Sequence, residues 1–169
     1  MLLIIDGYNL LHVDRSLTRL SATDLQRERE RLIDRLATYR RNRPCDITVV
    51  FDGWQSGWAT ENRGRQKGID LVFSKLGEKA DEVIKRMVKE KGAGVMVITS
   101  DREIARFAEK ISVSVVLSEQ FVERMEKVVF RPQEEYSGDE EENKGEKKKG
   151  PSKRLSKKER RARAALKKL

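Results

Sequence analysis

Four short apolar runs, separated by stretches with helical periodicity, constrain the fold of this chain more than any other feature. Each is four or five residues long and most are rich in β-branched residues; they are residues 2–5, 47–51, 95–99 and 113–117. Such runs are typical of strands buried in a parallel sheet. A weaker run, residues 69–73, is interrupted by Asp70 and predicts a shorter strand or one nearer an edge.

Amphipathic patterns between these runs predict the helices. Ser100 and Glu103 have capping-box spacing, which predicts that a helix begins there. Strands and helices that alternate in this way predict an α/β fold of three layers, with a mainly parallel central sheet flanked by helices. The helices are expected over residues 23–41, 79–89, 102–109 and 119–127.

The length and local composition predict one folded domain followed by a charged extension. A chain of 169 residues fits a single domain with one core. We expect this domain to span residues 1–130. Residues 131–150, where an acidic stretch is followed by a basic one, are expected to form a solvated linker, and residues 151–169 a basic tail with a marginal helical pattern.

The positive charge of the chain lies almost wholly at its C-terminal end. The net charge is +9, and residues 143–169 alone carry 13 Lys and Arg against Glu146 and Glu159. This distribution favours a polyanionic partner, and RNA or the ribosome is the leading one. A solvated tail without a specific partner and a membrane-surface helix are the alternatives; the second is weak because the apolar stripe is narrow.

The remaining composition favours a soluble protein of the cytoplasm. No apolar run reaches the roughly 18 residues that span a bilayer, and Asp6 interrupts the apolar N-terminus too early for a signal peptide. Cys45 is the only cysteine, which excludes an intramolecular disulfide. The oligomeric state does not follow from the sequence.

Aspartates follow the expected strands at the point where each strand ends. Asp6 follows residues 2–5, Asp52 follows residues 47–51, and Asp101 comes shortly after the run that begins at Val95. Because parallel strands point the same way, these carboxylates are expected to gather at the edge where open α/β sheets bind ligands. Asp81, in the first turn of an expected helix, could join them.

Four such carboxylates need a cation or a proton. Two like charges 4 Å apart repel by ~4 kcal/mol at an effective dielectric of about 20. Oxygen ligands favour Mg²⁺ or Mn²⁺, and divalent ions over a phosphodiester would favour its hydrolysis. His12 is the only histidine, so a mechanism that uses a pair of imidazoles is excluded within one chain.

Each aspartate also has a structural interpretation. Asp101 could sit in the first turn of its helix, and Asp81 could pair with Lys85 four residues later. Asp6 and Asp52 are harder to explain in this way, because neither has an evident cap or helix pair in the sequence. Four coincidences together are much less expected than one.

The motifs resemble the NYN-domain ribonucleases, in the bacterial YacP-like branch of the PIN-like nucleases. The likeness covers about residues 1–127 and rests on four segments: Asp6-Gly7-Tyr8-Asn9, Phe51-Asp52, Gly77-Glu78-Lys79-Ala80-Asp81 and Thr99-Ser100-Asp101. It implies a PIN-like, Rossmannoid fold and a metal-dependent ribonuclease, with endonuclease activity on mRNA or other single-stranded RNA as the expectation. It also implies that Asp6, Asp52, Asp81 and Asp101 hold Mg²⁺ or Mn²⁺.

By the same resemblance, Asn9 would orient a water molecule or a phosphate at the metal. Its alternative is a cap for the helix or turn after the first strand, and Ser100 is ambiguous in the same way. Lys79 departs from the family pattern, in which Thr is expected; its charge could bind phosphate or weaken metal affinity.

The stretch between Asp52 and Ile69 is expected to be a loop that contacts RNA. Aromatic residues beside positive charges suit unstacked bases and phosphates, although a loop Trp more often packs on its own domain. The expected substrate contacts are Trp54, Arg65, Lys67, Lys79, Ser100 and Arg102.

Other functions fit the sequence less well. A phosphatase of the haloacid dehalogenase type would need a second Asp where Tyr8 stands, and an adhesion-type metal site would need serines after the first Asp. The two glycine motifs of nucleotide-binding enzymes, G-x-x-x-x-G-K-S/T and G-x-G-x-x-G, are both absent from the sequence. A catalytically inactive protein that binds RNA or the ribosome stays open as the alternative.

Overall fold

The computed structural model describes residues 1–14, 22–53, 59–92, 94–129 and 164. The linker and tail predicted for residues 131–169 therefore lie, apart from residue 164, outside the described residues. The elements are β1 (Leu2–Asp6), α1 (Gly7–Asp14), α2 (Ala22–Asn42), β2 (Asp46–Phe51), β3 (Asn62–Gln66), β4 (Ile69–Phe73), α3 (Ala80–Lys91), β5 (Val95–Ile98), α4 (Arg102–Lys110), β6 (Ser114–Val116) and α5 (Ser118–Val129).

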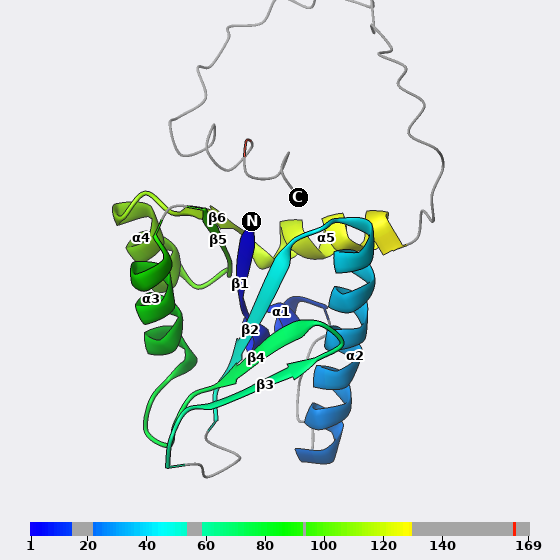
Figure 1. Cartoon of the computed structure of the whole chain (residues 1–169), viewed down its shortest axis with the longest axis horizontal. Coiled ribbons are helices and arrows are strands. Elements are labelled where there is room, and N and C mark those ends of the chain that lie inside the picture. Colours follow the sequence, from blue (N-terminus) through cyan, green and yellow to red (C-terminus); the bar gives the residue numbers. More distant parts are fainter. Residues whose placement is uncertain (15–21, 54–58, 93, 130–163, 165–169) are drawn as a thin grey trace, which may run out of the picture.

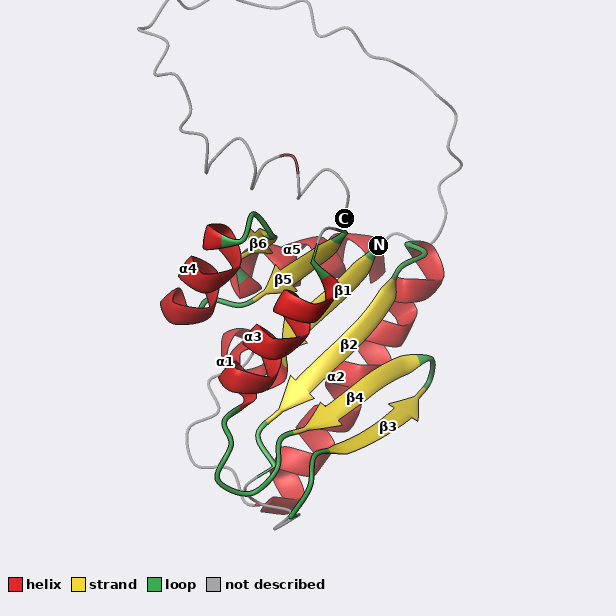
Figure 2. Ribbon diagram, turned by 60° about the vertical axis from the view of Figure 1, so that its left-hand side comes forward, coloured by secondary structure: helices red, strands yellow, loops and turns green. Residues whose placement is uncertain are grey.

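The six strands form one sheet in the order β3-β4-β2-β1-β5-β6 (Figure 1). All neighbours pair in parallel except β3, which runs antiparallel to β4. Helices α1, α2 and α5 cover one face and helices α3 and α4 the other. Figure 2 shows α2 behind the sheet and α3 in front of it. The predicted three-layer α/β fold with a mainly parallel sheet is confirmed.

Alternation along the strands divides the core between the two faces. On β1, Leu3 and Ile5 pack with α1, α2 and α5, whereas Ile4 packs with α3 and α4. All three are fully buried, and burial of each such side chain contributes roughly 1.5–3 kcal/mol. Both faces of the strand are therefore apolar, which is why the run lacks polar alternation.

The structure corrects the expectations for residues 52–73. Residues 69–73 form the full five-residue strand β4, so the expected shortening is wrong, but the strand does lie next to an edge of the sheet, which was the other expectation. The edge strand on this side is β3, within a stretch expected to be loop; its residues are polar and mostly exposed, so no apolar pattern marks it. Lys67 and Gly68 join β3 to β4 with φ of 53° and 82°, as two-residue hairpin turns require.

Helix α1 was not among the helices predicted with bounds, and the sequence suggested only a helix or turn after the first strand; its eight residues begin directly at the end of β1. Among the described residues, none of the helices combines the length and apolarity needed to cross a membrane.

The connections leave β1 at a topological switch point. The chain places β2 on one side of β1, and then passes through β4 and α3 to place β5 on the other side. In open parallel sheets, ligands bind in the crevice that such a reversal leaves beyond the carboxyl ends of the strands. This end of the sheet carries the predicted site.

Candidate functional site

The structure brings the four predicted aspartates to the carboxyl end of the central strands. Asp6 is the last residue of β1, Asp52 follows β2 directly, Asp81 is the second residue of α3, and Asp101 precedes α4. Their charges are close enough to influence one another. The negative charges of Asp81 and Asp52 raise the pKa of Asp6, and those of Asp101 and Asp52 raise the pKa of Asp81.

Asp6 is the most buried of the four, with 8% of its surface exposed. Its Oδ1 accepts a hydrogen bond from the Asn9 backbone N–H at 3.2 Å, and its Oδ2 accepts one from the Thr99 hydroxyl at 3.3 Å. Burial is the main cause that raises its pKa, from 3.8 to about 6, and the bond from Asn9 opposes that shift. Asp6 is thus an acid that is costly to ionise without a cation.

Three of the aspartates accept hydrogen bonds at the beginning of helices. Asp6 bonds the third residue of α1, and Asp52 Oδ1 accepts from the Ala80 N–H, the first of α3, at 2.6 Å. Asp101 caps α4, accepting from the N–H groups of Glu103 at 2.6 Å and Ile104 at 3.1 Å. The positive ends of three helix dipoles therefore face the acids and stabilise their negative charge.

These caps correct two sequence interpretations. The expectation that no cap would account for Asp6 and Asp52 was wrong, because α1 was not among the helices predicted with bounds and because Asp52 caps its helix across a sequence separation of 28 residues. The expected Ser100–Glu103 capping box was also wrong, since Asp101 takes the cap. The structural interpretation of Asp101 as part of the start of its helix is confirmed.

Asp81 is half-buried in the first turn of α3. Burial raises its pKa first, followed by the charge of Asp101, while Lys85 lowers it. No ion pair forms between Asp81 and Lys85 in the described part of the chain. Lys85 instead pairs with Glu82 at 3.1 Å and with Glu103 at 2.5 Å.

The donor set fits a small divalent cation in its chemistry. All four acids offer carboxylate oxygen, which Mg²⁺ and Mn²⁺ prefer, and a cation would relieve the repulsion that raises the pKa values of Asp6 and Asp81. Within the described residues, no three His, Cys, Asp or Glu side chains form a metal cage as they stand. Mg²⁺ needs only one or two carboxylates, with water and substrate phosphate completing its shell.

Asn9 lies inside α1, so it does not cap that helix. Its Oδ1 accepts two hydrogen bonds, from the Ser100 backbone N–H at 2.8 Å and from the Ser118 hydroxyl at 2.7 Å. Ser100 in turn accepts from the Ser118 N–H at 3.1 Å and donates its hydroxyl proton to Glu119. With its oxygen fixed by two donors, the Asn9 amide keeps its Nδ2 donors for another acceptor.

Sequence reasoning missed Thr99 and Ser118 as parts of this polar network. Thr99 bonds Asp6, and Ser118 is fully buried against Asn9. Ser118 comes two residues after β6, the same kind of strand-end position that revealed Asp6 and Asp52. Applying that rule to the fourth apolar run would have found it.

Ser118→Ala is expected to lower the free energy of unfolding by about 1 kcal/mol, because one buried acceptor bond of Asn9 is lost. We also expect the Asn9 amide to be held less firmly, since it loses one of its two anchors. Thermal unfolding of the wild type and the variant measures the loss of stability. Exposed Ser112→Ala is the control, and equal behaviour of the two variants would contradict a positioning role for Ser118.

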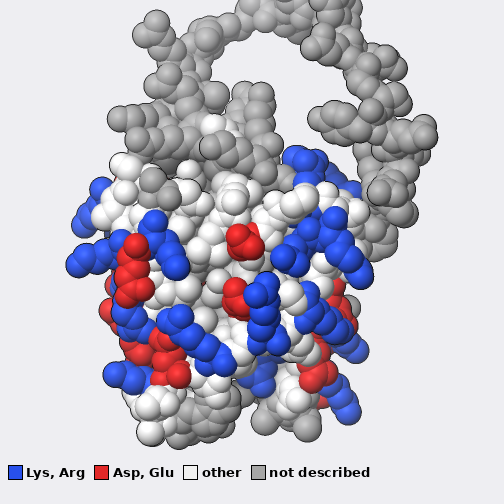
Figure 3. Space-filling view, in the orientation of Figure 1, with Lys and Arg blue, Asp and Glu red and all other residues white. Residues whose placement is uncertain are grey.

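The predicted basic contacts separate into two groups. Lys79 and Arg102 lie at the starts of α3 and α4, beside the aspartates, and both are exposed. Arg65 pairs with Asp70 at 3.5 Å and Lys67 pairs with Asp34, at the end of the β3–β4 hairpin away from the aspartates. Trp54 lies outside the described residues. On the face shown in Figure 3, basic and acidic side chains are interspersed.

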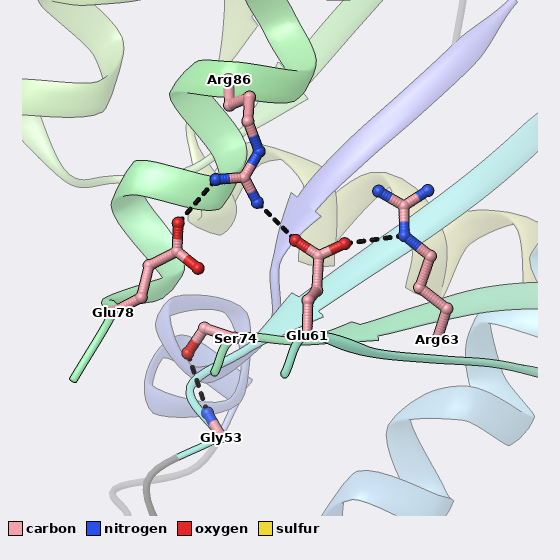
Figure 4. A network of polar contacts seen from close by, with 6 residues as sticks. All are labelled: Gly53, Glu61, Arg63, Ser74, Glu78 and Arg86. Carbon is pink, nitrogen blue, oxygen red and sulfur yellow. Dashed lines mark hydrogen bonds and ion pairs between the residues drawn. The ribbon is translucent and has the colours of Figure 1, made fainter. Parts of the chain in front are cut away.

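An ion-pair network ties the segments next to Asp52 and Asp81 together. Arg86 of α3 pairs with Glu78 at 2.6 Å and also with Glu61, which pairs with Arg63 at 2.7 Å (Figure 4). Nearby, the Gly53 N–H donates to the Ser74 hydroxyl at 3.0 Å. A Cβ at residue 53 would lie 1.8 Å from the Ser74 carbonyl oxygen, so only glycine fits directly after Asp52.

Comparisons with known proteins agree with this architecture. The family model of the YacP-like NYN domain matches residues 3–168. The uncharacterized protein YacP of Bacillus subtilis (strain 168) is 28% identical over 88 residues, which are 52% of this chain and 51% of that protein. The chain thus spans about half the length of this curated relative.

Two crystal structures of Rae1 (YacP) from Bacillus subtilis share the fold. The structure of a mutant form of that protein is similar with a TM-score of 0.62 and 22% identity, covering 76% of each chain. The other structure is similar with a TM-score of 0.61 and 23% identity, covering 76% of this chain and 75% of that one. The chain therefore belongs to the YacP-like NYN domain family of the PIN-like nuclease superfamily, and this membership supports a ribonuclease-type function.

Proposed function

We propose that this chain is a divalent-metal-dependent ribonuclease that hydrolyses phosphodiester bonds of single-stranded RNA such as mRNA, cutting within the strand. The observation that carries the proposal is the placement of four aspartates, Asp6, Asp52, Asp81 and Asp101, at the carboxyl end of the central strands, at the switch point of a nuclease-family fold. Acids that gather in the ligand-binding crevice of an open parallel sheet indicate a function for their charge.

In this proposal, Asp6, Asp52, Asp81 and Asp101 hold Mg²⁺ or Mn²⁺. The cation would neutralise charge on the phosphate and ease deprotonation of the attacking water. The chain's own residues prepare the site. Thr99 and the Asn9 N–H fix the Asp6 carboxylate, and the helix dipoles keep the acids ionised at lower cost.

Other residues would hold the RNA. The Asn9 amide offers donors to a phosphate oxygen, and Ser100, held by Glu119, fixes that amide from the other side. The positive charges of Lys79 and Arg102 would reduce the repulsion between the aspartates and the RNA backbone. Further contacts are proposed for Arg65, Lys67 and Trp54. The basic tail would raise affinity for RNA or the ribosome without taking part in the reaction, in the cytoplasm.

A second candidate is a protein that binds RNA or the ribosome without cleaving it. The observation that favours it is the capping role of Asp6, Asp52 and Asp101, because a helix cap accounts for each acid without any metal. In all three aspartates the cap uses Oδ1, so one side chain can both cap a helix and bind a metal.

Incubation of 5′-labelled single-stranded and hairpin RNA with the full chain tests the proposal. We expect internal cuts with Mg²⁺ or Mn²⁺ and none with EDTA, because the acids alone cannot neutralise the phosphate. Binding of RNA without cuts under all conditions, and also with translating ribosomes present, would favour the second candidate.

A further inference from the structure

Arg29 of α2 lies over the aromatic residues at the carboxyl end of the sheet. Its guanidinium carbon is 6.0 Å from the ring centre of Phe51 and 5.7 Å from that of Phe73. These rings stack on each other at 5.5 Å, and Tyr8 meets Phe51 edge-on at 5.2 Å. The rings hold the guanidinium in place through cation–π attraction.

Arg29 differs from other cations near the site in having no acidic partner. Half-buried Lys85 pairs with two carboxylates, and exposed Arg86 does so as well. Among the residues that the structure describes, no carboxylate pairs with Arg29. Within the described part of the chain, its one hydrogen bond is a long one, from Nη1 to the Tyr8 hydroxyl at 3.5 Å. A guanidinium has five N–H donors, so most of them and its full charge remain for an anion.

The position of Arg29 relates it directly to the aspartates. Phe51 immediately precedes Asp52, and Tyr8 comes two residues after Asp6. The charges of Arg29 and Asp52 both act on the Tyr8 hydroxyl, in opposite directions. Arg29 therefore flanks the acids on the α2 face of the sheet, whereas Asp81 lies in α3 and Asp101 caps α4, and both helices cover the other face.

We propose that Arg29 binds a phosphate of single-stranded RNA next to the one held at the aspartates, on the α2 side of the sheet edge; this rests on the proposed function. A crevice lined by acids repels a polynucleotide, and a cation beside it offsets that repulsion. Arginine suits this role because its planar fork matches two phosphate oxygens. A guanidinium already held over two rings loses less side-chain entropy when the phosphate arrives.

The salt dependence of RNA binding tests the phosphate contact. Binding of a short labelled single-stranded RNA is measured in EDTA over a series of salt concentrations, for the full chain and for Arg29→Gln. One lost phosphate contact lowers the slope of log K against log salt by about 0.7, which corresponds to about eightfold weaker binding at 50 mM salt relative to 1 M. Arg29→Lys keeps the charge and should keep the slope.

Arg27→Gln is the matched control. Arg27 lies two residues away on the same helix, is exposed and pairs with Asp24 at 3.7 Å. Its replacement by Gln removes the same positive charge, but from another face of the helix. We expect its slope to equal that of the wild type. An unchanged slope in Arg29→Gln, or equal losses in both variants, would overturn the proposal.

A measurement on the wild-type protein covers the case in which Arg29→Gln fails to fold. Phenylglyoxal modifies accessible guanidinium groups, and mass spectrometry locates the modified residues. RNA should protect Arg29 about fivefold or more and leave Arg27 unprotected; equal modification of Arg29 with and without RNA would refute the contact.

These measurements separate the contact from catalysis, because binding in EDTA needs no cleavage. Protection of Arg29 by RNA that is never cut with Mg²⁺ or Mn²⁺ would support the contact and contradict the proposed nuclease. Cleavage without protection of Arg29 would do the reverse.

Discussion

Asp6→Asn is expected to lower the rate of metal-dependent RNA cleavage about a thousandfold, because a carboxylate that supports a cation over the phosphate contributes several kcal/mol to the transition state. The fold should survive the change. Asparagine keeps an oxygen to accept from the Asn9 N–H, and its amide can donate to the Thr99 hydroxyl oxygen. Cleavage of labelled RNA with Mn²⁺, together with thermal unfolding, measures both effects.

Asp46→Asn is the matched control for that experiment. Asp46 is the exposed first residue of β2, so it lies at the opposite end of the sheet from Asp6. The same change of charge there should leave cleavage within about twofold of the wild type. A folded Asp6→Asn protein that still cuts at more than about a tenth of the wild-type rate would contradict the proposed role of Asp6.

The sheet and its aspartates could be predicted because both follow from local patterns. A run such as residues 2–5 is apolar on both faces, which only a doubly covered strand requires, and parallel strands bring their carboxyl ends to one edge. The position of Asp6 relative to Asp52 follows from this geometry. Asp81 could be placed only approximately, since it lies in a helix rather than at a strand end.

The rest depends on contacts that no local pattern records. Strand β3 has no apolar residue, and its pairing is fixed by backbone hydrogen bonds to β4 and by the turn at Lys67 and Gly68. Asp52 caps α3 from a distant strand, where the residue at the cap position, Lys79, provides no side-chain hydrogen bond. Such tertiary caps appear only when the chain has folded.

The caps also explain how the chain tolerates acids at its sheet edge. A carboxylate that accepts from helix N–H groups is stabilised before any cation binds. Asp52 and Asp101 have this support and lie nearer to solvent, whereas burial of Asp6 outweighs its hydrogen bonds and raises its pKa. The unfavourable charge is therefore concentrated on Asp6, so its ionisation should be measurable in the metal-free protein.

Metal-free wild-type protein should lose stability relative to Asp6→Asn as the pH rises through about 6. The pKa of Asp6 in the folded state is about 6 against 3.8 as its ordinary value, so its contribution is full below about pH 4 and is lost above the folded pKa. A shift of about two pKa units corresponds to roughly 3 kcal/mol. Urea unfolding of both proteins in EDTA at pH 4 and pH 8 measures the change, and the other acids largely cancel in the difference.

Mn²⁺ should reverse this effect at high pH if the cation binds at Asp6. At pH 8, millimolar Mn²⁺ is expected to stabilise the wild type more than Asp6→Asn. Binding of Mn²⁺ to the folded state raises the free energy of unfolding, and the variant lacks the Asp6 carboxylate that would bind it. Asp46→Asn should follow the wild type at both pH values and in Mn²⁺.

The pH dependence has its own contradicting outcome. If the difference in free energy of unfolding between wild type and Asp6→Asn stayed constant from pH 4 to pH 8, Asp6 would not be the group whose ionisation the buried site opposes.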